Sequence, residues 1–132
     1  MTLSRKTIGW LGPVLLCSTI TAVSGQSVDV EEVVPNQDKL IHILVFGLIA
    51  TAWLRWLLLF KSEISAAMWA IVLTGIFGAF DEFRQSFVPG RFAGIDDWLA
   101  DIFGAVLATL CYLKWKLYRS ILEWPKWFDP KA

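Results

Sequence analysis

The chain has 132 residues, enough for one domain. Hydrophobic residues make up 56% of it and charged residues only 18%, whereas a soluble domain is about 25% charged. A core of this size cannot bury so many apolar side chains, so we expect lipid to solvate part of the surface. Basic and acidic residues balance at 12 each, which excludes the basic surface of a nucleic-acid-binding protein.

Four apolar segments follow one another along the chain, at residues 7–24, 40–60, 64–80 and 98–113. A helix needs about 20 apolar residues to span a bilayer, within a range of about 17–25. The second segment fits this length, the first and third fit its short end, and the fourth needs terminal side chains that snorkel. None has the polar stripe of a soluble amphipathic helix. The sequence predicts an all-α integral membrane bundle of four transmembrane helices.

The first segment has a second interpretation. Arg5 and Lys6 precede an apolar stretch that ends in small residues at 22–24, which is also typical of a signal peptide. We expect the helix to be retained, and its cleavage would leave three spans. Cys17 and Cys111 lie in apolar segments and are predicted to be free thiols. The domain is predicted to be single over 1–132, with an interfacial tail at 119–132.

Basic residues predict the orientation of the bundle. With a cytoplasmic N-terminus, nine of them fall inside: Arg5, Lys6, Arg55, Lys61, Lys114, Lys116, Arg119, Lys126 and Lys131. Three fall outside: Lys39, Arg84 and Arg91. The positive-inside rule therefore predicts that both the N- and the C-terminus are cytoplasmic.

Polar residues are dense at 81–101, from the end of the third segment to the first turn of the fourth. Seven charged residues and one amide lie there: Asp81, Glu82, Arg84, Gln85, Arg91, Asp96, Asp97 and Asp101. In the predicted topology these residues lie at the same outer face as the start of the second segment. There, Asp38 and His42 are four residues apart and share one helix face, as do Asp97 and Asp101. The sequence therefore predicts that three helix ends converge at the outer face in one polar site.

Asp101 lies about one turn inside the apolar stretch. An unpaired carboxylate costs up to about 2.5–3.5 kcal/mol at mid-bilayer depth, and less near the surface. We therefore expect Asp101 to face the bundle and to meet Arg91, His42 or a cation. An ion pair that staples helices together would satisfy it equally well. Small residues at 104, 105 and 108 predict close packing of the same helix.

The chemistry of these residues leaves several roles open. The predicted ligand-binding residues are Asp38, Lys39, His42, Asp81, Glu82, Gln85, Arg91, Asp97 and Asp101. Four of the acids supply hard oxygen ligands suited to Mg²⁺ or Mn²⁺, namely Asp81, Glu82, Asp97 and Asp101. A divalent cation is thus a candidate cofactor. His42 is the candidate catalytic base, because an unperturbed imidazole titrates near neutral pH.

The spacing of these residues resembles a known family. Asp38-Lys39-x-x-His42, Asp81-Glu82-x-x-Gln85-x-x-x-Pro89-Gly90-Arg91 and Asp97-x-x-Ala100-Asp101-x-x-Gly104 together resemble the VanZ-like membrane proteins, over about residues 36–110. Many members have Asn where Asp101 stands. The family is named after a protein linked to teicoplanin resistance, so the resemblance implies a cell-envelope role in the bacterial cytoplasmic membrane. It implies no particular reaction.

Three functions are consistent with this pattern. The first is a membrane protein, in one or several copies, that binds an envelope ligand. The ligand would be a lipid, a lipid-linked cell-wall intermediate or a glycopeptide, with a phosphate or carboxylate on Lys39, Arg84 and Arg91. The second is a metal-assisted enzyme acting on a lipid phosphate or headgroup. The third is a small ion-coupled transporter that uses Asp101 and His42.

Overall fold

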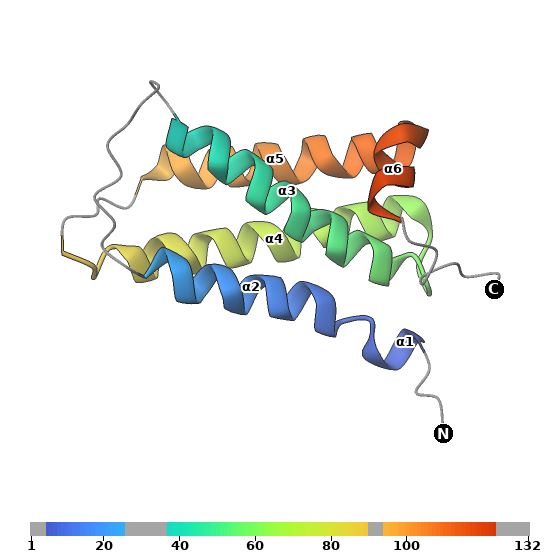
Figure 1. The fold of residues 1–132 in the computed structure, drawn as a ribbon, viewed down its shortest axis with the longest axis horizontal. Coiled ribbons are helices and arrows are strands. Elements are labelled where there is room, and N and C mark those ends of the chain that lie inside the picture. Colours follow the sequence, from blue (N-terminus) through green and yellow to red (C-terminus); the bar gives the residue numbers. More distant parts are fainter. Residues whose placement is uncertain (1–4, 26–36, 90–93, 124–132) are drawn as a thin grey trace.

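The computed structural model describes residues 5–25, 37–89 and 94–123, and every element in these ranges is a helix. The helices are α1 (Arg5–Ile8), α2 (Leu11–Ser24), α3 (Gln37–Leu57), α4 (Glu63–Gln85), α5 (Ile95–Lys114) and α6 (Lys116–Leu122). Helices α2 to α5 run side by side along the long axis of the molecule (Figure 1). The predicted all-α bundle of four long helices is confirmed.

The long helices have the dimensions of membrane spans. Lys6–Ser24, Gln37–Leu57 and Glu63–Gln85 are long and apolar enough to cross a bilayer. Helices α5 and α6 pass this test only together, and they are bent by 101° at the break between them. Helix α5 alone is too charged, because three carboxylates lie in its first two turns. The chain is thus a multi-pass membrane protein with three spans, or four if the bent pair counts as one.

The helices extend past the predicted apolar segments at one end of the bundle. Helix α3 begins at Gln37 rather than at residue 40, α4 ends at Gln85 rather than at residue 80, and α5 begins at Ile95 rather than at residue 98. The additional turns carry charged side chains, several of which pair across helices, as Lys39 of α3 does with Asp97 of α5. Hydropathy therefore located the apolar part of each helix but not its end.

The other end of the bundle also departs from the predicted bounds. The first segment is two helices, α1 and α2, and Pro13 lies in the first turn of α2, where a proline is tolerated. Residues 119–122 of the predicted tail belong to α6, whereas 124–132 lie outside the described residues. Arg55 of α3 donates a hydrogen bond to the Leu122 carbonyl at 3.2 Å, so the end of α6 is held against the bundle.

Helix α3 lies at the centre and contacts α2, α4 and α5. Its largest interface is with α5, and small residues make this close approach possible. A Cβ added at Gly104 would lie 2.3 Å from the Ile43 carbonyl oxygen, and one added at Gly47 would lie 3.1 Å from the Gly104 oxygen. Ala105 is fully buried beside them. The predicted close packing of this helix is therefore confirmed.

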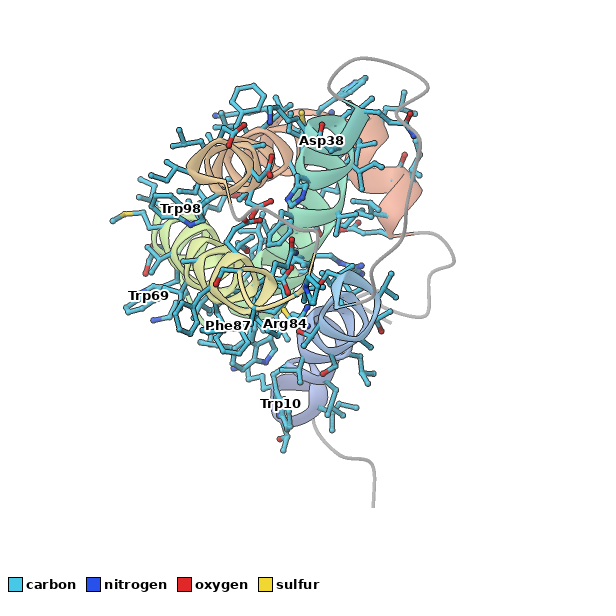
Figure 2. All side chains as sticks on the ribbon, turned by 90° about the vertical axis from the view of Figure 1, so that its left-hand side faces the viewer. Trp10, Asp38, Trp69, Arg84, Phe87 and Trp98 are labelled. Carbon is cyan, nitrogen blue, oxygen red and sulfur yellow. The ribbon has the colours of Figure 1, made fainter. Side chains whose placement is uncertain are left out.

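Apolar side chains cover the outside of the bundle as well as its core. Leu54, Ala66 and Ala70 are fully buried toward the α6 end. Trp69 and Phe87 point away from the bundle (Figure 2) and are 50% and 71% exposed. A surface of this kind matches a lipid solvent rather than water.

The ends of the helices are grouped in the way the topology requires. Helices α2 and α4 end, and α3 and α5 begin, at one end of the bundle, whereas α1 and α6 lie at the other end (Figure 1). The first and last described helices are therefore on the same side. That this side faces the cytoplasm remains a prediction from the basic residues.

Candidate functional site

Polar side chains from four helices meet where α2 and α4 end and α3 and α5 begin. We call this group the polar cluster, which consists of Ser24, Asp38, Lys39, His42, Asp81, Glu82, Arg84, Gln85, Asp96, Asp97 and Asp101. Figure 2 looks onto this end, with Asp38 at the start of α3 and Arg84 on the side of α4 that faces α2. The cluster contains three separate sets of contacts.

The outermost set joins the starts of α3 and α5. The Lys39 Nζ atom donates a short hydrogen bond to Asp96 and another to Asp97 Oδ1 at 3.1 Å. Asp38 lies 3.8 Å from the same ammonium. Because Lys39 and Asp96 are exposed to solvent, these pairs stabilise the fold little. They do neutralise the Lys39 charge within the cluster.

The second set is buried between α3, α4 and α5. The His42 Nδ1 atom lies 2.7 Å from Asp101 Oδ1, and the Asp101 side chain is only 1% exposed. The His42 ring stacks on Phe46, with ring centroids 5.8 Å apart. Gly78 of α4 leaves room for the carboxylate, since a Cβ there would lie 2.7 Å from Asp101 Oδ2. Asp101 therefore faces the interior of the bundle, where it meets His42.

Glu82 completes this buried set. It follows Gly78 by one turn on the same face of α4 and is 7% exposed. Its Oε2 atom accepts a hydrogen bond from the Gly94 backbone N–H at 3.0 Å, which ties the end of α4 to the start of α5. One ligand atom each of His42, Glu82 and Asp101 lies within 4.8 Å of the other two. Among the described residues, this group is the one that could hold a metal ion.

The third set joins α4 to α2 through Asp81. Its Oδ1 atom accepts hydrogen bonds from Ser24 Oγ and from Arg84 Nη2, both at 2.9 Å. Gln85 Nε2 donates to its Oδ2 atom at 2.7 Å. Arg84 Nη2 also donates to Ser24 Oγ. The buried carboxylate of Asp81 is thus satisfied by three donors, which excludes it from the metal group.

An apolar cavity of about 550 Å³, which is widely open to the surface of the bundle, lies beside the third set, between α2, α3 and α4. It is lined by Val14, Cys17, Ser18, Thr21, Ala22, Trp53, Leu73 and Phe77. Thr21 is one turn from Ser24, and Phe77 is one turn from Asp81. The cavity therefore ends close to the polar cluster. Cys17 is on its wall, and both Cys17 and Cys111 are free thiols as predicted.

Sequence reasoning placed most of the polar cluster but missed some of its members. Arg91 lies outside the described residues, and of the four predicted metal ligands only Glu82 and Asp101 belong to the buried set. Asp97 instead pairs with Lys39. Ser24 was interpreted only as part of a cleavage motif, because no local pattern shows that α2 packs against α4. The Gly94 backbone N–H leaves no signal in a sequence at all.

Comparisons with known proteins agree with the residue pattern. No curated protein and no solved structure matches the chain. The family model described as VanZ/LLP1 matches residues 7–119, which include the whole of α2 and all three sets of the polar cluster. The match extends beyond residues 36–110, on which the resemblance rested. The chain is a multi-pass membrane protein that belongs to the VanZ/LLP1 family.

Proposed function

We propose that this protein binds a lipid-linked molecule of the bacterial cell envelope. The anionic headgroup would lie at Arg84 in the polar cluster, and the hydrocarbon chain would lie in the apolar cavity. One observation carries the proposal: the cavity lined by Thr21 and Phe77 ends one helical turn from the contacts of Ser24 and Asp81 with Arg84. An amphiphilic lipid likewise has an apolar hydrocarbon chain next to a charged headgroup. Membership of the VanZ family supports an envelope role in the cytoplasmic membrane.

Arg84 supports an anionic headgroup. Its Nη2 atom is engaged by Asp81 and Ser24, but its Nε atom is buried and has no hydrogen-bond partner among the described residues. A buried donor left unpaired costs about 1–3 kcal/mol. A phosphate oxygen would satisfy it with a charge-assisted hydrogen bond, and the planar guanidinium suits phosphate recognition.

The size and lining of the cavity support a hydrocarbon chain. Its volume of about 550 Å³ falls within the roughly 300–1,000 Å³ typical of ligand pockets. The hydroxyls of Ser18 and Thr21 donate to backbone carbonyls of their own helix, at 2.9 Å each. These hydroxyl protons are therefore already satisfied, and the wall of the cavity is effectively apolar.

Native mass spectrometry of the detergent-purified protein tests the proposal, with a phospholipid and a polyprenyl phosphate as probes. The wild-type protein should retain one of them, and Arg84→Gln should weaken retention roughly tenfold or more, because hydrogen bonds to charged groups contribute about 1.5–3 kcal/mol. Arg119→Gln is the matched control, since Arg119 also pairs with an acid but lies on α6 at the other end.

A second variant tests the cavity independently of the polar cluster. Ser18→Phe fills the cavity without touching the polar cluster and should also reduce retention of both probes. Retention that is equal in the wild type, Arg84→Gln and Ser18→Phe would contradict the proposal. So would a loss of equal size in Arg119→Gln.

The two other functions predicted from the sequence depend on the buried set instead. A metal-assisted enzyme would use His42, Glu82 and Asp101, and an ion-coupled transporter would use His42 and Asp101. Uptake by proteoliposomes that is abolished by Asp101→Asn would favour transport over binding. Uptake that is absent, or independent of Asp101, would remove the transporter.

A further inference from the structure

We infer that His42, Glu82 and Asp101 form a site for a divalent metal cation. One residue comes from each of α3, α4 and α5, so the site exists only when the three helices are packed together. The existence of this site does not depend on the proposed function. Only its role, which is to hold a phosphate oxygen of the bound headgroup, rests on that function.

The distances suit a metal ion. The three ligand atoms lie within 4.8 Å of one another. Nitrogen and oxygen ligands sit about 2.0–2.2 Å from a zinc ion, so two ligand atoms of a tetrahedral site are about 3.3–3.6 Å apart. Ligand atoms as far apart as 4.8 Å must therefore approach each other by roughly 1.2–1.5 Å, shared between two side chains, to bind one ion. The hydrogen bond from the Gly94 N–H already holds the Glu82 carboxylate in the buried set, and the space that Gly78 leaves accommodates the Asp101 carboxylate.

Among the residues that the structure describes, the charges of the buried set are not balanced. Asp101 and Glu82 are 1% and 7% exposed, and His42 is the sole hydrogen-bond partner of Asp101 among the described residues. The second oxygen of each carboxylate accepts no hydrogen bond from those residues. A buried carboxylate without a compensating charge is strongly unfavourable.

The two bases of the polar cluster in the described part of the chain, Lys39 and Arg84, do not supply this compensation. Lys39 is paired with Asp96 and Asp97, and the Nη2 atom of Arg84 is paired with Asp81. With both carboxylates ionised, the described residues of the buried set carry one more negative than positive charge, even when His42 is protonated. A divalent cation would neutralise both carboxylates and bind the imidazole at the same time.

The ligand types indicate which cations fit. Two carboxylates favour hard cations such as Mg²⁺ and Mn²⁺, whereas an imidazole favours first-row transition metals such as Zn²⁺. A set with one imidazole and two carboxylates therefore favours Mn²⁺ or Zn²⁺ over Mg²⁺. Three protein ligands also leave coordination positions open, and a phosphate oxygen of the headgroup can occupy one of them.

Equilibrium binding of Mn²⁺ alone, followed by electron paramagnetic resonance on the purified protein, tests the site, and Zn²⁺ is tested by competition. The wild-type protein should bind one equivalent, and Asp101→Asn and Glu82→Gln should each lose this binding. Asp96→Asn is the control, because Asp96 is an exposed acid of the same cluster that contacts Lys39 and not the buried set. Absence of stoichiometric Mn²⁺ and Zn²⁺ binding in the wild type, or an equal loss in Asp96→Asn, would overturn the inference.

Substitutions at two glycines, Gly78 and Gly75, test the site even if the carboxylate variants fail to fold. A Cβ at Gly78 would lie 2.7 Å from Asp101 Oδ2, whereas a Cβ at Gly75 would meet only Ile102, at 3.6 Å. Gly78→Ala should lower Mn²⁺ affinity roughly 10–100-fold, the range seen when groups that position metal ligands are changed. Gly75→Ala should leave it unchanged. Equal affinities in the two folded variants would count against the site.

The outcomes also separate this inference from the proposed function. Stoichiometric Mn²⁺ binding without retention of either lipid probe would leave the metal site standing and remove lipid binding. If the protein binds no metal but retains a lipid probe regardless of a chelator and of Asp101→Asn, lipid binding stands and the metal site is removed.

Discussion

The pairing of His42 with Asp101 shows how one buried charge shapes this bundle. Asp101 was expected to face the interior because a carboxylate exposed to acyl chains is costly. The sequence leaves its partner open, since Arg91, His42 and a cation all fit the spacing. The distance of 2.7 Å between His42 Nδ1 and Asp101 Oδ1 identifies the histidine as its partner among the described residues. Sequence alone ranks such partners poorly, because the choice depends on how far α3 and α5 are rotated toward each other.

We predict that His42→Ala destabilises the protein more than Lys39→Gln does. Both residues lie on α3 and pair with acids of α5. The histidine variant leaves buried Asp101 without its partner, which should cost at least about 1–3 kcal/mol of unfolding free energy. The lysine variant breaks pairs that solvent screens, so it should lower the unfolding free energy much less. Denaturation of the metal-free protein measures both, and equal losses would show that the Asp101 contact is not structural.

At the scale of the helices, small residues determine how closely α3 and α5 approach. The sequence predicted this packing from Gly104 and its small neighbours, but it did not identify Gly47 as the matching position on α3. The helix ends were harder to predict. Hydropathy predicts a loop for the charged turns at 81–85 and 95–97. They are helical, and neighbouring helices supply partners such as Ser24 of α2 for Asp81.

We predict that Gly104→Ala weakens the α3–α5 interface. A Cβ there would lie 2.3 Å from the Ile43 carbonyl oxygen, and backbone atoms cannot move aside as a flexible side chain can. Overpacking of this kind costs about 1–3 kcal/mol. Gly75→Ala is the control, because its nearest contact outside α4 is an ordinary one at 3.6 Å. Thermal unfolding should show a midpoint below that of the wild type for Gly104→Ala but not for Gly75→Ala. Similar midpoints for the two variants would exclude tight backbone packing between α3 and α5.

At the scale of the whole molecule, the polar cluster and the α1 and α6 helices occupy opposite ends of the bundle. This arrangement followed from the order of the apolar segments, because alternating spans bring the same three helix ends together. The contribution of α2 could not be predicted in this way. Its Ser24 reaches Asp81 only because α2 packs against α4, and this packing also creates the apolar cavity.

We predict that the polar cluster faces away from the cytoplasm. In a chain whose two cysteines are replaced, a cysteine at the exposed Ser86 should react with a membrane-impermeant maleimide in intact cells. A cysteine at the exposed Ser120 on α6 should react only after the cells are permeabilised. The opposite pattern would mean that the basic residues do not determine the orientation of this bundle.

The most direct test of lipid binding is photo-crosslinking with a polyprenyl phosphate that carries a diazirine in its hydrocarbon chain. Cross-links should concentrate on the cavity residues Cys17, Thr21 and Phe77, and Arg84→Gln should reduce them. Cross-links spread evenly over outward-facing residues such as Met68 and Trp69, at the same level in Arg84→Gln, would mean that the bundle only dissolves in lipid and has no lipid-binding site.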